Sequence, residues 1–500
     1  MLSDPKYAQL VASATWDDAM LEELEIEVQE RLLVTVGGGL GSFALVDFLR
    51  IAGVEPAQIA VLTSLEVPWQ TFAARADASQ LGPQERLRSD SSSTIHNIWG
   101  WPGYAVSEAW TERTLRPLWK VITEPFLAEY FTPRVRNVIA SLERETERIG
   151  WQTMVAPCWV ELVRRRSGGG YFALARALDG GRLTAYRCRH LHLALGYPGP
   201  RVLSDAQAFR DANPGCQRVA NAYEEHEHVY QAARTCAGRI VIRGSGIAAS
   251  RILERLIQER EDSGATFEIL HVFRHFVRAA VGPPWFRRPG RDGFAYQPFN
   301  FPRGAGGGQL RQRMLRMSSK ERAELLPRIG GTTTAWRRRW QRQLERGRRE
   351  KWYRAVEGEL GEISAAPDGG LALLLEERGS APERVDADFL LDATGLEDSV
   401  MRCPLLADLV TTSGATLNAL GRLDVAPSFE VRALRNGPGR MYASGAATLG
   451  GALAPVDSFW GLTHAAMEIT DDLADQQSCE FPGVMRSLTQ WWRWARRLPP

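Results

Sequence analysis

The chain has 500 residues, a length that corresponds to about three domains. It is 44% hydrophobic and 24% charged, and its net charge of +2 does not indicate a protein that binds nucleic acid or a membrane surface. No apolar run approaches the roughly 18 residues that a membrane-spanning helix needs, and the acidic N-terminus lacks the features of a secretion signal. The 6 cysteines include no C-x-x-C pair, which argues against a zinc knuckle or a disulfide reductase. We therefore expect a cytoplasmic globular protein with reduced thiols.

Residues 1–30 are expected to form a helical extension, and the first informative pattern follows them. Residues 31–36 and 59–63 are apolar runs rich in β-branched side chains, as in buried parallel strands. Between them stand a glycine-rich turn and a helical pattern. The small residues of the turn are Gly37, Gly39, Gly41 and Ser42. This order predicts a β-α-β unit that binds a dinucleotide.

The same order recurs further along the chain. A strand-like run at residues 239–243 leads into Gly244, Gly246 and Ala249, then into a helical pattern and a second run at 267–273. In such turns the first glycine makes the tight turn, the second lets the backbone approach the pyrophosphate, and the third lets helix and strand pack closely. The helix N-terminus faces the phosphates. Two copies predict an α/β fold with two Rossmann-like dinucleotide-binding lobes.

The residue after the second strand of each unit bears on the choice of nucleotide. An acid is expected there if the ribose is bound, and the first unit offers Ser64 or Glu66. The second unit has Arg274, and an arginine suits a 2′-phosphate, so we favour NADPH over NADH. The alternative for Arg274 is an ordinary solvated charge at a strand end.

The rest of the chain falls into three parts. Residues 159–200 alternate strand-like runs with Gly-Gly turns, which predicts a small antiparallel β element. Residues 280–355 predict a helical insert rich in arginine and tryptophan. Its segment 336–354 could bind an anionic or carrier-bound substrate or stack on a ring-bearing partner, or it could be a solvated or packing face; its aromatic residues are Trp336, Trp340, Trp352 and Tyr353. Strands return at 371–377, 388–392 and 440–446, and residues 491–497 are expected in a docking helix.

The order of the motifs resembles a known family. Residues 193–198 (LALGYP) and 392–395 (DATG, ending in Gly395) are similar to segments where two-lobed flavoproteins cross between lobes, and residues 227–230 are similar to an H-S-x-Y segment. Over roughly residues 30–475 the chain resembles FAD- and NADPH-dependent monooxygenases, which include lysine and ornithine N-hydroxylases.

The resemblance implies an FAD lobe formed by residues 31–235 and 386–500, and an NADPH lobe at 236–385 that carries the insert. It implies oxygenation of a small molecule with O₂ and NADPH, N-hydroxylation being the nearest analogue, in an enzyme that associates as a homo-oligomer. In the family the last flavin strand commonly ends in Gly-Asp, whereas here Gly445 precedes an alanine. Asp457 could approach the flavin instead, or it could cap the following helix.

The loop after the first unit, residues 91–103, corresponds to the flavin-facing loop of the family. There Asn97 could hydrogen-bond the flavin or nicotinamide, His96 could donate a proton, and Trp99 could help to keep the pocket dry. The alternative is a structural loop. His190 and His192 should share one face of a strand, where we assign them a structural role, and we expect no metal site. Two other functions remain open: a flavin oxidase or dehydrogenase, or a non-catalytic dinucleotide-binding protein that acts through its basic insert.

Overall fold

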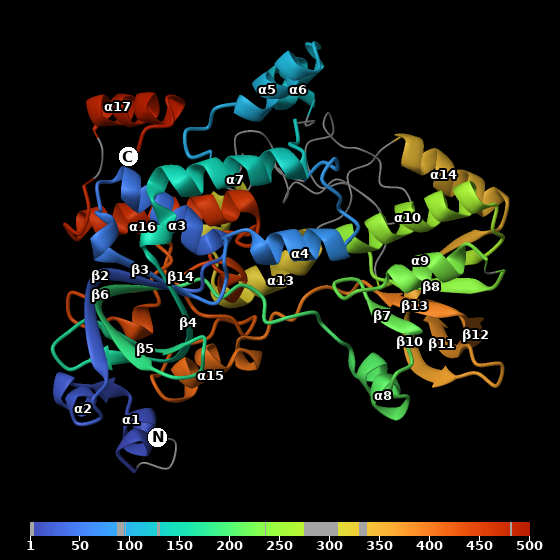
Figure 1. The fold of residues 1–500 in the computed structure, drawn as a ribbon. Helices are drawn as coiled ribbons and strands as arrows, with labels where there is room; N and C mark the ends of the chain where they lie inside the picture. Colours follow the sequence, from blue (N-terminus) through green and yellow to red (C-terminus); the bar gives the residue numbers. More distant parts are fainter. Residues whose placement is uncertain are drawn as a thin grey trace.

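The chain folds into two lobes, each built on a seven-stranded sheet (Figure 1). The computed structural model describes residues 5–87, 95, 97–127, 131–235, 237–274, 309–329, 338–480 and 483–500. Parallel strands dominate the part of each sheet that carries a glycine turn, and antiparallel strands extend it. The expected fold class, two Rossmann-like lobes with an added antiparallel β element, is confirmed.

The first sheet has the strand order β1-β4-β3-β2-β6-β14, and β5 pairs antiparallel with β4 and β6. Its strands are β1 (Thr15–Trp16), β2 (Glu27–Val36), β3 (Ile59–Thr63), β4 (Val155–Arg166), β5 (Tyr171–Ala177), β6 (Leu183–Leu193) and β14 (Met441–Ala443). Alternation along β2 divides the core: Leu33 packs with the helices on one face, and Val34 and Val36 pack on the other. The helices on the first face are α3 (Leu40–Ile51), α7 (Val135–Ile149) and α16 (Phe459–Asp475), and α15 (Pro404–Thr411) lies on the second.

The second sheet has the order β12-β11-β10-β9-β8-β13-β7. Its strands are β7 (Val219–Asn221), β8 (Arg239–Arg243), β9 (Glu268–Phe273), β10 (Tyr353–Ala365), β11 (Leu371–Glu377), β12 (Glu383–Ala387) and β13 (Phe389–Asp392). One face packs on α9 (Glu227–Ala233), α10 (Ile247–Ser263) and α14 (Arg338–Arg349), and α8 (Ser204–Ala212) packs on the other. The strands of the glycine unit, β8 and β9, lie at the centre of this sheet.

Three boundaries in the structure differ from those expected from the sequence. The N-terminal extension contains α1 (Pro5–Ala12) and α2 (Asp18–Glu22), but β2 already begins at Glu27 because its first residues pair with β6. The expected limits of the second lobe at 236 and 385 are wrong on both sides. β7 and β13 both belong to the second sheet, since β13 pairs with β7 and β8. The chain therefore crosses between lobes before residue 204 and after residue 392.

The basic insert contacts both lobes rather than belonging to the second alone. Met314 of α12 (Gln309–Arg316) and Leu325 of α13 (Ser319–Ile329) pack against Ala454 of the first lobe. Arg311 of α12 lies 2.8 Å from Glu468 of α16. Leu344 of α14, in contrast, is buried in the core of the second lobe.

Two aromatic residues of the insert are core residues. Trp352 and Tyr353 are buried where α14 leads into β10, so of the two alternatives the packing face is the one that holds for these residues. β10 was not predicted, and its long run begins at Tyr353, within the expected helical insert. Trp336 lies outside the described residues.

The remaining helices lie around the first lobe. They are α4 (Gln70–Ala78), α5 (Gly103–Thr111), α6 (Arg116–Leu127) and α17 (Val484–Ala495), with short 3₁₀ turns at Pro56–Gln58, Trp151–Thr153, Val400–Arg402, Arg432–Leu434 and Gly445–Thr448. In Figure 1, α5, α6 and α17 lie beyond α7, on the side away from the first sheet. Within the described ranges, no helix is long and apolar enough to cross a membrane.

The N-terminal segment is held to the first lobe by a buried arginine. The Arg164 side chain is fully buried, and its guanidinium lies 5.8 Å from the ring centre of Trp16. It donates hydrogen bonds to the carbonyl oxygens of Ser13 (2.7 Å) and Val11 (2.7 Å) and pairs with Asp408 of α15. One side chain therefore joins β4, α15 and the C-terminal end of α1 with the residue that follows it.

Replacing Arg164 with leucine should lower the free energy of unfolding by about 3 kcal/mol, because it leaves Asp408 and two carbonyl groups without their donor. The matched control is Arg176→Leu, which breaks the half-exposed pair with Glu161 on the neighbouring strand and should cost below about 1 kcal/mol. Denaturant unfolding of both variants measures the difference. Equal losses in the two variants would contradict this account of the N-terminal anchor.

Candidate functional site

The first glycine turn lies directly against the segment that crosses between the lobes. Gly37 has φ +92°, and a Cβ there would lie 2.5 Å from the carbonyl oxygen of Ala194. Its amide donates to the carbonyl oxygen of Leu62 (2.9 Å) on β3. Gly39 precedes α3 as its N-cap, and nothing lies within 4 Å of the place a Cβ would take. The turn therefore leaves open space in front of the N-terminus of α3, as phosphate binding requires.

Close packing of α3 on the crossing segment occurs at Gly41, one residue before the position expected from the motif. A Cβ on Gly41 would lie 3.1 Å from the Ser444 hydroxyl and 3.2 Å from the Cβ of Ala194. Ser42 is buried, and its hydroxyl donates to the carbonyl oxygen of Gly37. Ser42 therefore stabilises the turn with a hydrogen bond that glycine or alanine could not make.

The second glycine turn repeats this arrangement. Gly244 has φ +123°, and a Cβ there would collide with the carbonyl oxygen of Ala393 in the second crossing. Gly246 is the N-cap of α10, and Ala249 is buried in its first turns. His271 of β9, which the sequence analysis did not single out as a site residue, lies with Nε2 2.5 Å from the carbonyl oxygen of Gly244. A carbonyl only accepts, so Nε2 carries the proton.

Both crossings contain a glycine in the left-handed region with open space beside it. Gly196 has φ +67° and Gly395 has φ +115°, and nothing lies within 4 Å of either Cβ position. The second crossing is fixed by Asp392, which accepts from the backbone amide of Thr394 (3.0 Å) and from Arg243 (2.6 Å). Arg243, at the end of β8, was missed because its buried partners come from distant parts of the sequence.

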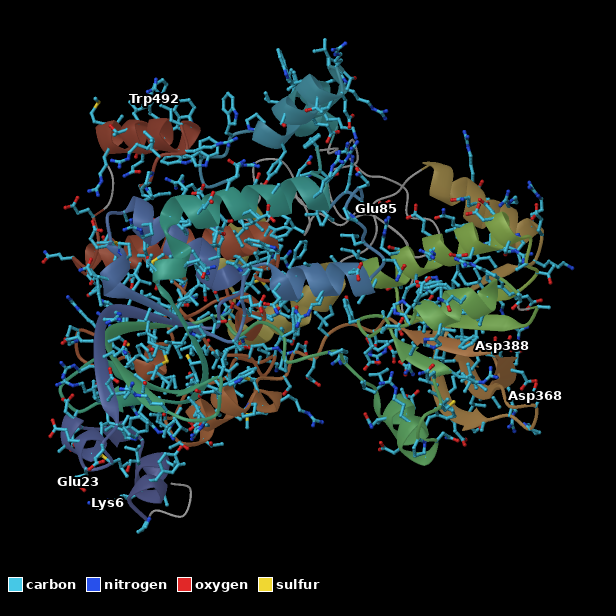
Figure 2. The ribbon with its side chains drawn as sticks, viewed as in Figure 1. Lys6, Glu23, Glu85, Asp368, Asp388 and Trp492 are labelled. Carbon is cyan, nitrogen blue, oxygen red and sulfur yellow. The ribbon has the colours of Figure 1, made fainter. Side chains whose placement is uncertain are left out.

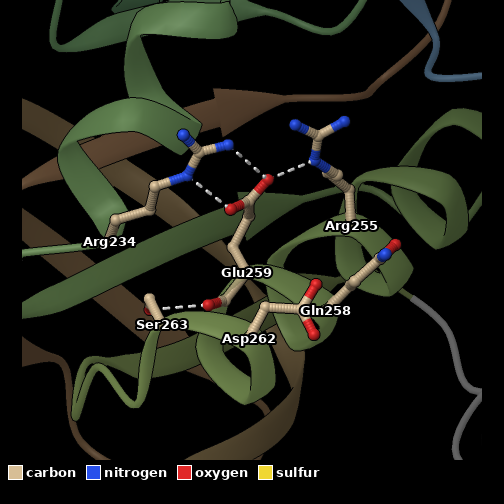
Figure 3. Close-up of a pocket in the computed structure, with 6 residues that line it drawn as sticks. All are labelled: Arg234, Arg255, Gln258, Glu259, Asp262 and Ser263. Atoms are coloured by element: carbon tan, nitrogen blue, oxygen red, sulfur yellow. Dashed lines mark hydrogen bonds and ion pairs between the residues drawn. The ribbon is translucent and has the colours of Figure 1, made fainter.

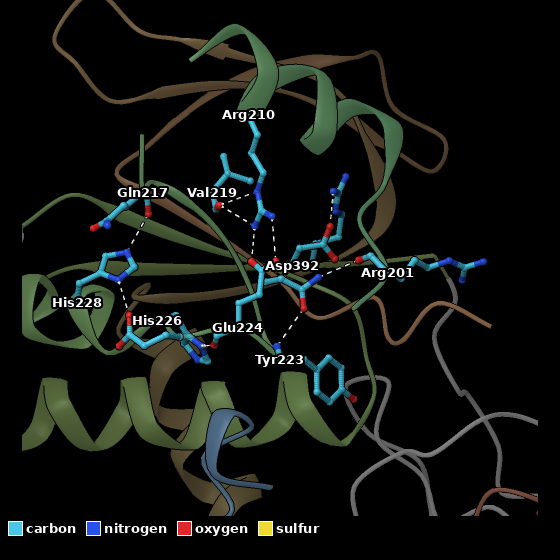
Figure 4. Close-up of polar contacts among 12 residues, drawn as sticks. Arg201, Arg210, Gln217, Val219, Tyr223, Glu224, His226, His228 and Asp392 are labelled. Atoms are coloured by element: carbon cyan, nitrogen blue, oxygen red, sulfur yellow. Dashed lines mark hydrogen bonds and ion pairs between the residues drawn. The ribbon is translucent and has the colours of Figure 1, made fainter. Parts of the chain in front are cut away.

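The segment similar to H-S-x-Y orders the connection between β7 and α9 (Figure 4). Here His226, rather than His228, lies beside Tyr230: its Nε2 is 3.0 Å from the Tyr230 hydroxyl and its Nδ1 is 2.8 Å from the carbonyl oxygen of Glu224. His228 instead lies 2.9 Å from the carbonyl oxygen of Gln217. Burial lowers the pKa of His226, so its neutral form is favoured.

The first crossing is also fastened to the first lobe through Tyr197. Its hydroxyl donates to Asp457 (2.5 Å), and its carbonyl oxygen accepts from Arg75 of α4 (2.9 Å). Burial raises the pKa of Tyr197, and the nearby Asp457 raises it further. The alternative role of Asp457 as a helix cap is wrong, because the Ser458 hydroxyl accepts from the amide of Gly461 (3.0 Å) and caps α16.

A further ion pair connects the lobes beside the second glycine helix. Glu85 lies beyond the end of α4, toward α10 (Figure 2), and its carboxylate is 2.6 Å from Arg251. Arg251 follows the glycine turn by only a few residues, so this contact fixes the start of α10 relative to the first lobe.

The expected ribose and phosphate residues lie at the ends of β3 and β9. Ser64 is half-buried and Glu66 is exposed, with the Glu66 amide donating to the side chain of Gln70 (2.8 Å). Arg274 is 64% exposed and lies 3.4 Å from Glu359. The structure thus leaves these side chains accessible, and their roles stay predictions. Thr63, which the sequence analysis did not single out, packs against Gly38 so closely that a Cβ there would overlap it.

The expected catalytic loop belongs to the first lobe, since Ile95 is buried in its core. Asn97 is buried, and its side chain bonds the backbone of Trp101: Oδ1 accepts from the amide (3.3 Å) and Nδ2 donates to the carbonyl oxygen. The buried indole nitrogen of Trp99 has no hydrogen-bond partner among the described residues. His96 lies outside the described residues. The catalytic roles stay predictions.

His190 and His192 share one face of β6, and both are buried. Burial lowers the pKa of each to about 3, and the nearby Arg189 and Arg440 contribute at His190. His190 Nε2 lies 2.8 Å from the Ser478 hydroxyl, and His192 lies between Thr35 (2.9 Å) and Ser444 (2.9 Å). Across the described ranges, no group of three or more histidine, cysteine or acidic side chains is arranged to hold a metal ion.

A separate hollow of about 470 Å³ lies on the second lobe, beside the C-terminal half of α10 (Figure 3). Arg234 and Arg255 both pair there with Glu259, at 2.7 and 2.6 Å. The glycine turn lies at the opposite end of α10, so we assign this hollow no part in dinucleotide binding.

No family model and no curated protein matches the sequence, but solved structures match the fold. The ornithine hydroxylase PvdA from Pseudomonas aeruginosa is 17% identical, with a TM-score of 0.60 over 90% of this chain and 100% of that one. The ornithine N-hydroxylase KtzI from Kutzneria sp. 744 is 14% identical, with a TM-score of 0.63 over 90% and 100%. The cadaverine monooxygenase DfoA from Erwinia amylovora, solved with FAD, is 13% identical, with a TM-score of 0.62 over 88% and 94%. The chain therefore has the fold of these monooxygenases, and the resemblance inferred from the motif order is confirmed for the fold.

The buried histidines predict an acid-sensitive structure. His190, His192 and His271 have pKa values lowered to about 3, 3 and 4, so unfolding lets each of them take up a proton below about pH 6.5. Stability from this source is present above pH 6.5 and is lost as the pH falls, at about 1.4 kcal/mol per pH unit for each histidine. Denaturant unfolding between pH 7 and 5 measures this slope. His190→Asn should reduce the number of protons taken up on unfolding by one, which lowers the slope by about 1.4 kcal/mol per pH unit. An equal slope in the variant would contradict the assignment.

Proposed function

We propose that the protein is an FAD-dependent, NADPH-reduced monooxygenase that hydroxylates the amine nitrogen of a small molecule. The observation that carries the proposal is the pair of strand–glycine turn–helix units, in which Gly37 and Gly244 each meet the backbone of a crossing segment. The proteins that share this fold are described as ornithine hydroxylases and a cadaverine monooxygenase, and this supports an amine substrate.

The residues present fit FAD in the first lobe. Glycine occupies the positions where a Cβ would collide with the first crossing, Gly37, or would crowd the packing of α3 on it, Gly41. The space beside Gly39 is open. We assign the pyrophosphate to the turn formed by Gly37, Gly39, Gly41 and Ser42. Ser64 or Glu66 would bind the ribose, and Gly445 and Asp457 would lie on the flavin side.

The second lobe fits NADPH in the same way. The turn at Gly244 and Gly246 would receive the pyrophosphate, and the small Ala249 lets α10 pack closely behind it. Arg274 would bind the 2′-phosphate, and Gly395 would border the nucleotide at the second crossing. When bound, the two cofactors supply hydride transfer and the reaction with oxygen. The protein's part is to orient them and to keep water out.

Three residues of the loop at 95–103 have proposed roles near the reacting atoms. Asn97 holds the loop through the backbone of Trp101, and Trp99 offers a buried indole donor that a bound ligand could accept from. We propose His96 as the proton donor. A buried donor left without a partner costs about 1–3 kcal/mol, so its satisfaction by a ligand would favour binding.

The proposal also covers the role of the basic insert, the oligomeric state and the cellular compartment. The basic insert contacts both lobes and would receive an anionic or carrier-bound substrate, and the enzyme would associate as a homo-oligomer. The five described cysteines are free, which is consistent with action in the cytoplasm.

The purified protein should carry FAD that NADPH bleaches under anaerobic conditions, and NADH should act less readily. Arg274→Ala should lower kcat/KM for NADPH by about 10–100-fold while sparing NADH, because a charge-assisted phosphate contact is lost. Stopped-flow absorbance and oxygen uptake with added diamines and amino acids measure these steps. Flavin that NADPH leaves untouched would favour an oxidase. Absence of flavin after reconstitution with FAD would favour a non-catalytic role through the basic insert.

The two glycine turns can be tested separately. Gly37→Ala should weaken FAD binding by at least about tenfold, and Gly244→Ala should slow reduction by NADPH while FAD stays bound, because in each a Cβ meets a backbone carbonyl. Gly264→Ala is the matched control: it has φ +71° at the end of α10, with open space around it. If all three variants behaved alike, strain in the backbone alone would explain the result and the two-site assignment would fail.

A further inference from the structure

A continuous chain of hydrogen bonds runs beneath the first glycine turn. From the carbonyl oxygen of Gly37 it passes to the hydroxyl of Ser42, then to that of Thr35 (2.7 Å), to Nδ1 of His192 (2.9 Å), and from Nε2 to the hydroxyl of Ser444 (2.9 Å). Its four side chains come from α3, β2, β6 and the residue after β14, and each of them is at most 3% exposed. Four separate elements are thus tied together inside the first lobe.

The direction of every bond in this chain is fixed from one end. The Gly37 carbonyl only accepts, so Ser42 donates to it and accepts from Thr35. Thr35 in turn accepts from His192, whose proton is therefore on Nδ1, and Nε2 accepts from Ser444. Burial supports this neutral tautomer, since it lowers the pKa of His192 to about 3. Each hydroxyl therefore donates one defined hydrogen bond in the chain, and no single bond can change direction unless its neighbours change with it.

The two ends of the chain are the two turns assigned to FAD. One is the turn at Gly37. The other begins at Ser444 and continues into Gly445, which has φ +74°. The Ser444 hydroxyl also lies 3.1 Å from the place where a Cβ of Gly41 would be, directly under the first turn of α3. The spacing between the phosphate side and the flavin side of the site therefore depends on this chain.

We propose that His192, acting with Thr35 and Ser444, is a positioning residue that sets the spacing between the Gly37 and Gly445 turns for FAD. The inference rests on the proposed function. It concerns residues that do not themselves touch the cofactor and that no dinucleotide motif includes.

Two comparisons within the molecule support the proposal. The second lobe also places a buried neutral histidine beneath its glycine turn, since His271 of β9 donates directly to the carbonyl oxygen of Gly244. His190, two residues before His192 and on the same face, bonds Ser478 after α16 and the amide of Arg440, and it is bonded to neither the Gly37 nor the Gly445 turn. His190 is as fully buried as His192, so the His190–Ser478 bond offers a control with the same chemistry on the same strand, with Ser478 itself half-buried.

The test measures the dissociation constant of FAD with deflavinated protein, together with the visible circular dichroism of the bound flavin. Thr35→Val keeps the shape of the side chain and cuts the chain at its centre, and it should raise the dissociation constant by about tenfold and change the dichroism. His192→Leu should act similarly. His192→Asn places an amide donor near the position of Nδ1, so it should recover part of the affinity.

Ser478→Ala is the control and should change the dissociation constant by less than about twofold, although it also removes a histidine–serine bond from β6. If a histidine variant fails to fold, Ser444→Ala breaks the same chain at its far end with a smaller change. The proposal is overturned if Thr35→Val, Ser444→Ala and Ser478→Ala all bind FAD like the wild type. Failure of the wild-type protein itself to bind FAD would instead remove the proposed function, and this inference with it.

Discussion

The structure depends on one close approach, made twice, between a glycine with positive φ and the backbone of a crossing segment. Gly37 meets the carbonyl oxygen of Ala194, and Gly244 meets that of Ala393. A side chain at either glycine would push the turn away from the crossing, and the helix behind it would move as well. Because each crossing connects one lobe to the other, these contacts fix the position of each dinucleotide turn relative to the path between lobes.

Polar contacts hold the first crossing and the second glycine turn in place. Tyr197 in the first crossing bonds Asp457 and Arg75 of the first lobe, and Glu85 of the first lobe pairs with Arg251 of the second, just after its glycine turn. The insert adds a second connection, since α12 and α13 pack on the first lobe and α14 on the second. Polar contacts thus set the geometry where the two proposed cofactors would meet, while the apolar cores hold each lobe separately.

The sequence predicted the elements whose pattern is local. Glycines between an apolar strand and a helical run identified both dinucleotide units, and Gly-Gly turns identified the antiparallel element. It could not predict pairings between distant segments, such as Arg243 with Asp392 or His192 with Ser444, because no spacing along the chain encodes them. The boundaries of the second lobe failed for the same reason: β7 and β13 are three and four residues long, and only their pairing assigns them to a sheet. The sequence could not decide between stacking and packing for Trp352 and Tyr353, because an arginine-rich context hides a buried strand start.

The discontinuity of the first lobe has a consequence for how the protein forms during translation. The second sheet uses one uninterrupted stretch of chain, from β7 to β13, whereas the first needs β14 and α16 from near the C-terminus. In synthesis from the N-terminus, the second lobe can therefore complete its sheet while the first still lacks an edge strand and a covering helix. Of the two turns assigned to FAD, the one at Gly445 is synthesised about 400 residues after the one at Gly37. The nascent protein would thus acquire its NADPH-type lobe before its FAD-type site is complete.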